Sequence, residues 1–187
     1  MGRALGLILL LALLGLVATA SAETVRHLDV EQDGRAYTVQ FEAVVEAPPD
    51  RVFALLTDYD RLEQLNPSII EAERLGMAGG MERVRTVLES CVAFFCRQME
   101  RIEEITTRHQ RTIESRVVPE ASEVESGSTR WELAAVTEGT RIRFRTRMVP
   151  EFWVPPVIGP WAIRSNLESD LRVLIRRLEE LGSSTGN

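Results

Sequence analysis

One long amphipathic helix ends a chain whose preceding residues, 69–149, have the pattern of β-strands. From Pro160 onward, leucine and isoleucine recur at intervals of three and four residues, the spacing that lines one face of a helix. The stripe consists of Ile163, Leu167, Leu171, Leu174, Leu178 and Leu181. Gly182 is expected to end the helix and to leave residues 182–187 as a flexible tail. The apolar face of this helix must be buried, and only the strands are available to bury it.

Six strand-length segments separated by turn residues precede this helix. They cover residues 69–77, 82–90, 97–107, 110–118, 129–137 and 140–149. In the last two, apolar and polar side chains alternate, and Arg141, Arg143, Arg145 and Arg147 form a solvated outer row. Six strands in succession imply an antiparallel meander.

A further strand and two short helices are predicted before the meander. Residues 35–47 alternate between apolar and polar side chains and stop at Pro48-Pro49. A short helix then runs to about Thr57, and one more helical turn precedes Asn66-Pro67. The sequence therefore predicts an α+β fold, in which a curved seven-stranded antiparallel sheet is covered by one long helix. Because a helix cannot touch such a sheet everywhere, we expect a cavity between them.

Residues 1–22 have the pattern of a secretory signal peptide. Arg3 supplies a positive charge, residues 4–17 are an almost unbroken apolar run, and Ala20-Ser21-Ala22 provides a small-x-small site before Glu23. The alternative is a membrane anchor, but the run is shorter than the roughly 20 residues that a spanning helix needs. We therefore expect an exported protein with an amino-terminal extension at residues 23–34 and one domain at residues 35–181.

Export makes a disulfide the expected state of the two cysteines, because the compartment outside the cytoplasm is oxidising. In a continuous strand Cys91 and Cys96 would lie about 16 Å apart, beyond the reach of a disulfide. A bridge therefore requires a turn at residues 92–95. The alternative is a redox-active pair, but dithiol oxidoreductases use a CxxC spacing rather than the spacing found here.

The composition argues against several classes of function. There are 22 basic and 28 acidic side chains, and a net charge of −6 disfavours binding of nucleic acid through a basic face. Every basic residue is arginine, so Schiff-base and phosphate-loop lysines are excluded. His27 and His109 are the only histidines and match no common zinc spacing with the cysteines. We expect no metal site and no cofactor.

One stretch before the meander is distinctive. It runs from Val44 to Asp60 as VVEAPPDRVFALLTDYD, and Asn66-Pro67 follows it. Together with the order of elements over residues 35–181, it resembles the START-like (SRPBCC) superfamily, and within it the polyketide cyclase and coenzyme Q-binding branch. The resemblance implies a helix-grip fold, shared by lipid and quinone carriers, plant hormone and allergen proteins, and some cyclases. With the signal peptide, it makes the periplasm the expected compartment, with extracellular release as the alternative.

This resemblance and the expected cavity predict a binding or carrier protein for a hydrophobic small molecule, such as a lipid, isoprenoid, quinone or polyketide-like compound. We expect apolar and aromatic side chains to line the cavity: Phe41, Tyr59, Trp131, Leu133, Ile142, Phe144, Met148, Trp153, Trp161 and Leu167. For Trp153 and Trp161, simple packing over the core is the alternative.

Phe94 and Phe95 form an apolar tip where a turn would normally be polar. We expect this tip to contact a membrane surface or a partner, so that an apolar ligand can pass without entering water. The alternative is burial against a neighbouring loop.

Two other functions are consistent with the same sequence. A cyclase or dehydratase would use the cavity with Tyr59 and an inward carboxylate or arginine as acid and base, although no histidine lies at a suitable position. An interaction module would dock on a membrane complex through its aromatic tip. No catalytic residue is assigned.

The disulfide prediction has a direct test. Titration of the exported, denatured and unreduced protein should find no free thiol, and reduction should release both Cys91 and Cys96. Reactive thiols before reduction would contradict the pairing.

Overall fold

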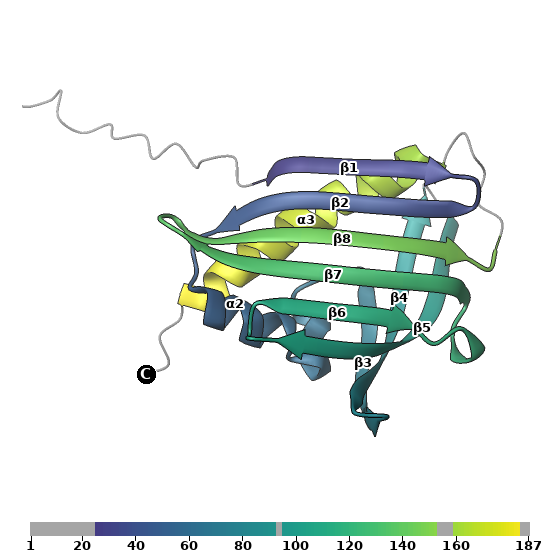
Figure 1. Cartoon of the computed structure of the whole chain (residues 1–187). Coiled ribbons are helices and arrows are strands. Elements are labelled where there is room, and N and C mark those ends of the chain that lie inside the picture. Colours follow the sequence, from purple (N-terminus) through teal and green to yellow (C-terminus); the bar gives the residue numbers. More distant parts are fainter. Residues whose placement is uncertain (1–24, 93–94, 153–158, 184–187) are drawn as a thin grey trace, which may run out of the picture.

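The computed structural model describes residues 25–92, 95–152 and 159–183. Its eight strands form one antiparallel sheet in the order β1-β2-β8-β7-β6-β5-β4-β3 (Figure 1). The strands are β1 Val25–Asp33, β2 Ala36–Val45, β3 Ile69–Ala78, β4 Met81–Val92, β5 Phe95–Arg108, β6 Thr112–Val117, β7 Val124–Val136 and β8 Gly139–Pro150. The helices are α2 Pro49–Leu56 and α3 Gly159–Ser183, with the short 3₁₀ helices η1 Tyr59–Gln64 and η2 Pro119–Ala121.

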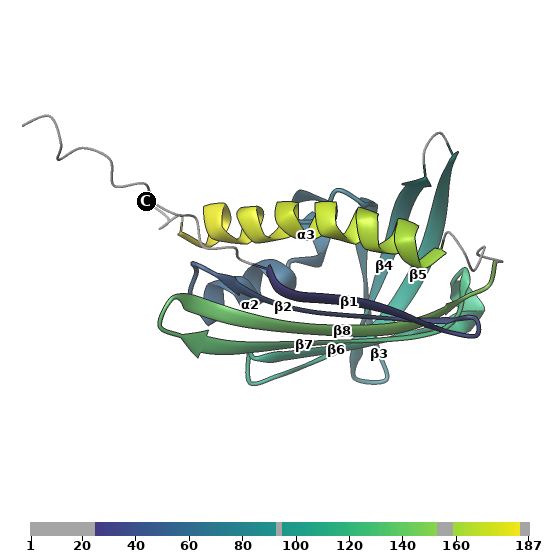
Figure 2. The ribbon, with the colours of Figure 1, turned by 90° about the horizontal axis from the view of Figure 1, so that it is seen from above.

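The sheet curves strongly, and α3 lies along its concave side. Figure 2 shows β4 and β5 rising past one end of α3, while α2 lies on the same side of the sheet near the other end. This arrangement is the predicted helix-grip fold, with the two short helices between β2 and β3 as expected. None of the helices in the described residues has the length and apolar character needed to cross a bilayer.

The sheet has one strand more than the seven predicted, because residues 25–33 of the expected extension form the edge strand β1. Its register with β2 shifts between Val25 and His27, so one extra residue interrupts the period of two. Val25 and Leu28 consequently both pack against the core although they are three residues apart. This irregular spacing hides the strand from a search for strict alternation.

The carboxyl-terminal half of α3 anchors the helix to the core. Leu171, Leu174 and Leu178 of the predicted stripe are buried, and Leu178 is fully inaccessible to solvent. Gly182 does not end the helix, which continues to Ser183. A Cβ atom at Gly182 would lie 2.6 Å from the Cβ of Ala47, so glycine here permits close approach of α3 to the end of β2.

The β4–β5 hairpin carries the predicted disulfide. Cys91 and Cys96 are direct cross-strand partners with Cα atoms 4.0 Å apart, and their sulfur atoms are bonded. Asn166 of α3 donates a hydrogen bond from Nδ2 to the carbonyl oxygen of Cys91 at 3.2 Å. The hairpin therefore contacts the amino-terminal half of α3.

The packing of α3 generates a stability prediction. Leu178→Ala should lower the free energy of unfolding by about 2–5 kcal/mol, because it removes a fully buried side chain and leaves a cavity. Arg172→Ala on the exposed side of the same helix should change it by no more than about 0.5 kcal/mol. Chemical denaturation of both variants measures the difference, and equal effects would contradict the anchoring role of this half of α3.

Candidate functional site

A cavity of about 310 Å³ lies between α3 and the concave face of the sheet. Its wall combines residues of β2, η1, β4 to β8 and α3, so no single segment builds it. The side chains of Leu56, Leu62, Leu65, Val84, Leu88, Ile105, Ile113, Ile163 and Leu174 give it a largely apolar surface. The volume falls near the lower end of the about 300–1,000 Å³ typical of small-molecule pockets.

Five of the ten residues predicted to line a cavity do so. These are Tyr59, Trp131, Phe144, Met148 and Leu167. Trp131 and Phe144 are cross-strand partners on β7 and β8, and their ring centroids lie 4.4 Å apart at a steep angle. The contact fixes two large aromatic surfaces in the wall with few free rotations.

Four predicted lining residues lie elsewhere. Phe41 of β2 is the cross-strand partner of Phe144 and stacks on it with ring centroids 4.8 Å apart, but it does not line the cavity. Leu133 and Ile142 are buried in the main core at the end of the sheet that α2 contacts. Trp161 is 65% exposed near the start of α3 and does not line the cavity. Alternation along a strand predicts which side chains lie on the inner face. It does not predict whether a side chain on that face borders the cavity or is packed in the core.

Three predicted residues lack a described side chain. Trp153 and Phe94 lie outside the described residues. Phe95 begins β5 and its backbone pairs with Val92. The contact of this tip with a membrane or a partner stays a prediction.

A polar cluster in the cavity wall has no counterpart in the sequence prediction. Arg101 and Glu103 of β5 form an ion pair, with Nε and Oε2 2.9 Å apart and side chains only 16% and 10% exposed. The Ser115 hydroxyl of β6 donates a hydrogen bond of 2.6 Å to Glu103 Oε1. All three residues line the cavity. An otherwise apolar chamber therefore contains one charged, hydrogen-bonded patch.

The sequence contains a weak signal for this patch. Arg101, Glu103 and Ile105 alternate along β5, which predicts that all three share a face. Glu100 and Glu104 place charged side chains on the opposite face as well. The sequence therefore does not show which face of this strand is turned toward the core. The register of β4 with β5 determines that Arg101 lies on the inner face, because it pairs Arg101 with Thr86, which is buried.

Tyr59 contributes a second polar group to this region. Its hydroxyl oxygen is buried and has no hydrogen-bond partner among the described residues. Burial raises the pKa of the Tyr59 phenol above its ordinary value, so the group stays protonated at neutral pH. The Arg74 guanidinium lies 5.1 Å from the centre of the ring.

A hydrogen bond joins α3 to the segment that leads into β3. The Ser68 hydroxyl donates to Asp170 Oδ2 at 2.5 Å. Burial raises the pKa of the Asp170 carboxyl, and the bond from Ser68 opposes this in part. Ser68 lies between Asn66 and Ile69, which both line the cavity. The contact therefore holds α3 against the wall of the cavity.

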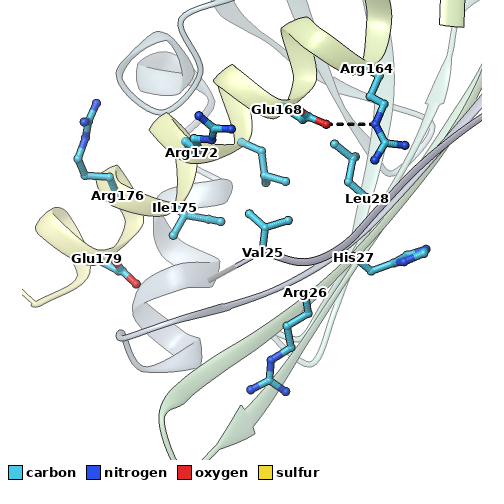
Figure 3. Close-up of a pocket in the computed structure, with 11 residues that line it drawn as sticks. Val25, Arg26, His27, Leu28, Arg164, Glu168, Arg172, Ile175, Arg176 and Glu179 are labelled. Carbon is cyan, nitrogen blue, oxygen red and sulfur yellow. Dashed lines mark hydrogen bonds and ion pairs between the residues drawn. The ribbon is translucent and has the colours of Figure 1, made fainter. Parts of the chain in front are cut away.

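A second hollow, of about 550 Å³, is an open groove between β1 and α3. Figure 3 shows Val25 and Leu28 on one side and charged side chains of α3 on the other, with Arg164 paired to Glu168. Arg172, Arg176 and Glu179 continue this charged rim. Because the groove is open and charged, it buries little apolar surface. The smaller cavity beneath α3, with its mainly apolar lining, is the better candidate for an apolar ligand.

Within the described residues, no group of three or more histidine, cysteine, aspartate or glutamate side chains could hold a metal ion. His27 and His109 are both exposed, and His109 lies in the turn between β5 and β6. Neither histidine lines the cavity.

A family model described as polyketide cyclase / dehydrase and lipid transport matches residues 36–181. The chain belongs to this family. The match agrees with the resemblance to the START-like superfamily, whereas the link to coenzyme Q stays a prediction. A comparison with curated protein sequences finds no match.

Solved structures with the same fold include other proteins of the START type. A protein of Thermus thermophilus is 18% identical with a TM-score of 0.62, and the match covers 80% of this chain and 99% of that one. An aromatase/cyclase from a Streptomyces species is 18% identical with a TM-score of 0.58, covering 78% and 93%. A STAR-related lipid transfer protein from Xanthomonas axonopodis is 14% identical with a TM-score of 0.60, covering 81% and 98%. At these identities the likeness shows the fold alone.

The partly buried carboxyl of Asp170 generates a prediction about pH. A group whose pKa is raised in the folded state destabilises the fold increasingly as the pH rises through that pKa. Asp170→Asn keeps an acceptor for Ser68 but removes the charge, so its stability relative to the unchanged protein should increase as the pH rises above the ordinary aspartate value of 3.8. Urea unfolding over a pH series measures this. Ser68→Ala should make the loss of stability with pH steeper, and a pH-independent difference for Asp170→Asn would contradict the argument.

Proposed function

We propose that this protein is an exported binding or carrier protein that holds a hydrophobic small molecule in the cavity beneath α3. The ligand class is a lipid, isoprenoid, quinone or polyketide-like compound, as the sequence predicts. The observation that carries the proposal is the cavity of about 310 Å³ beneath α3, with its aromatic and aliphatic walls. A family whose description includes lipid transport supports it.

The binding energy would come from burial of apolar surface. A ligand that hides roughly 300 Å² of apolar area gains about 7 kcal/mol at about 25 cal/mol per Å², before the costs of association are subtracted. Trp131 and Phe144 offer rigid aromatic faces, so little side-chain entropy is lost when a ligand binds. The volume favours a compact ring system or a single chain over a two-chain phospholipid.

A cyclase or dehydratase is the second candidate function, and the buried polar groups of the cavity favour it. Glu103 supplies an inward carboxylate and Tyr59 a protonated phenol, which are the types of group that the sequence hypothesis requires as base and acid. However, both oxygens of Glu103 are already engaged, by Arg101 and by Ser115. A base that must first break two such contacts is poorly prepared for proton transfer, so binding is the better-supported function.

Filling the cavity tests the proposed function. Leu167→Trp places a larger side chain in the wall, and we expect at least a tenfold loss of affinity for apolar ligands from a lipid and quinone panel. Leu181→Trp is the matched control, because Leu181 lies near the end of the same helix, is 37% exposed and does not line the cavity. Fluorescence titration of both variants measures the affinities.

Native mass spectrometry of protein purified from its own host is the complementary measurement. We expect an apolar adduct on a chain that begins at Glu23, since export would remove residues 1–22. Repeated absence of any adduct, together with no binding to the panel, would contradict the carrier function. A chain that still carries residues 1–22 would contradict cleavage of the signal peptide without affecting the cavity argument.

A further inference from the structure

The polar groups of the cavity wall differ in whether their hydrogen-bonding capacity is already used. Glu103 accepts from Ser115 through Oε1 and is paired with Arg101 through Oε2. Thr129 and Thr146 bond to each other through their hydroxyl oxygens at 2.9 Å. These carboxylate and threonine oxygens are therefore occupied by the protein itself, whereas the buried hydroxyls of Tyr37 and Tyr59 have no partner among the described residues.

The N–H donors of the wall are not occupied in this way. Nε of Arg101 lies 2.9 Å from Glu103 Oε2, yet this buried nitrogen makes no hydrogen bond with a described residue, and neither do the two terminal nitrogens of the guanidinium. Asn66 accepts from the backbone N–H of Ser68 through Oδ1 at 2.9 Å, and its amide nitrogen has no bond to a described residue. Both Arg101 and Asn66 line the cavity. A ligand therefore meets N–H donors that require an acceptor.

The charge of the patch limits which acceptor fits. Arg101 and Glu103 together carry no net charge, and Glu103 is 7% exposed, so its carboxylate is poorly screened by solvent. A ligand carboxylate or phosphate at Arg101 would lie beside this buried negative charge. A neutral carbonyl oxygen would satisfy the same N–H donors without that repulsion.

We propose that the cavity selects neutral apolar molecules that carry a carbonyl oxygen, such as ketones, esters or quinones, and that Arg101 binds this oxygen. Glu103 positions Arg101 through the ion pair, and Ser115 in turn holds Glu103 through its hydrogen bond. This inference rests on the proposed binding function and assigns the polar end of its ligand. It distinguishes this ligand class from pure hydrocarbons and from fatty acids or lipid phosphates.

A thermodynamic cycle tests the proposal with three probes of similar shape: naphthyl methyl ketone, ethylnaphthalene and naphthoate. Arg101→Met combined with Glu103→Gln removes the cation without leaving an unpaired buried charge. The ratio of ketone affinity to hydrocarbon affinity should fall by about tenfold in this double variant, because only the ketone loses a hydrogen bond to a charged donor. In the unchanged protein, naphthoate should bind more weakly than the ketone.

Arg83→Met combined with Glu104→Gln is the matched control. Arg83 of β4 and Glu104 of β5 form an ion pair at 2.7 Å but do not line the cavity. This control should leave the affinity ratio unchanged. A ratio that moves less than threefold in the cavity variant, or equally in the control, would overturn the proposal.

A measurement on the unchanged protein removes the dependence on variant folding. The carbonyl stretch of isotope-labelled naphthyl methyl ketone should move to lower frequency on binding than in an apolar solvent, because a charged donor polarises the bond. A stretch that stays at the apolar value would overturn the proposal, and so would naphthoate binding as tightly as the ketone. If ethylnaphthalene binds while the ketone preference is absent, the carrier function stands without this inference. If none of the three probes binds, the carrier function itself fails.

Discussion

The cavity depends on where α3 contacts the bent sheet. The carboxyl-terminal half of the helix packs tightly through Ile175 and Leu178, and Gly182 lets it approach Ala47 at the end of β2. Towards its amino terminus, Ile163 and Leu167 are only partly buried and line the cavity instead. A straight rod cannot follow a strongly curved surface, so close packing at one end leaves space at the other.

Two polar contacts hold the less buried half of α3 in place. Asn166 bonds to the carbonyl of Cys91, and Asp170 accepts from Ser68. The disulfide joins the strands of the hairpin at the position to which Asn166 attaches. The helix thus covers the cavity through a few hydrogen bonds rather than through a continuous apolar interface. Such a cover costs less to displace than a packed core, which is compatible with the ligand binding proposed above.

Much of the fold could be predicted because it follows from local patterns. The stripe from Ile163 to Leu181 and the alternation in β7 and β8 predict which faces are apolar, and Asn66-Pro67 marks the end of the short helices. The strand β1 was missed because a bulge between Val25 and His27 breaks its period. The assignment of lining residues was half right, since alternation cannot separate a wall residue such as Phe144 from a core residue such as Ile142 on the same strand.

The sequence by itself determined the order of the elements from residue 35 onward, the disulfide pair and the apolar faces, because these depend on residues close together in the chain. The tertiary structure alone decided that Arg101, Glu103 and Ser115 meet inside the cavity and that Trp161 lies outside it. Strand register and sheet curvature fix these positions, and both result from contacts between residues far apart in sequence. The chemistry that a ligand meets is therefore a product of packing, although the existence of a hollow follows from the pattern of the chain.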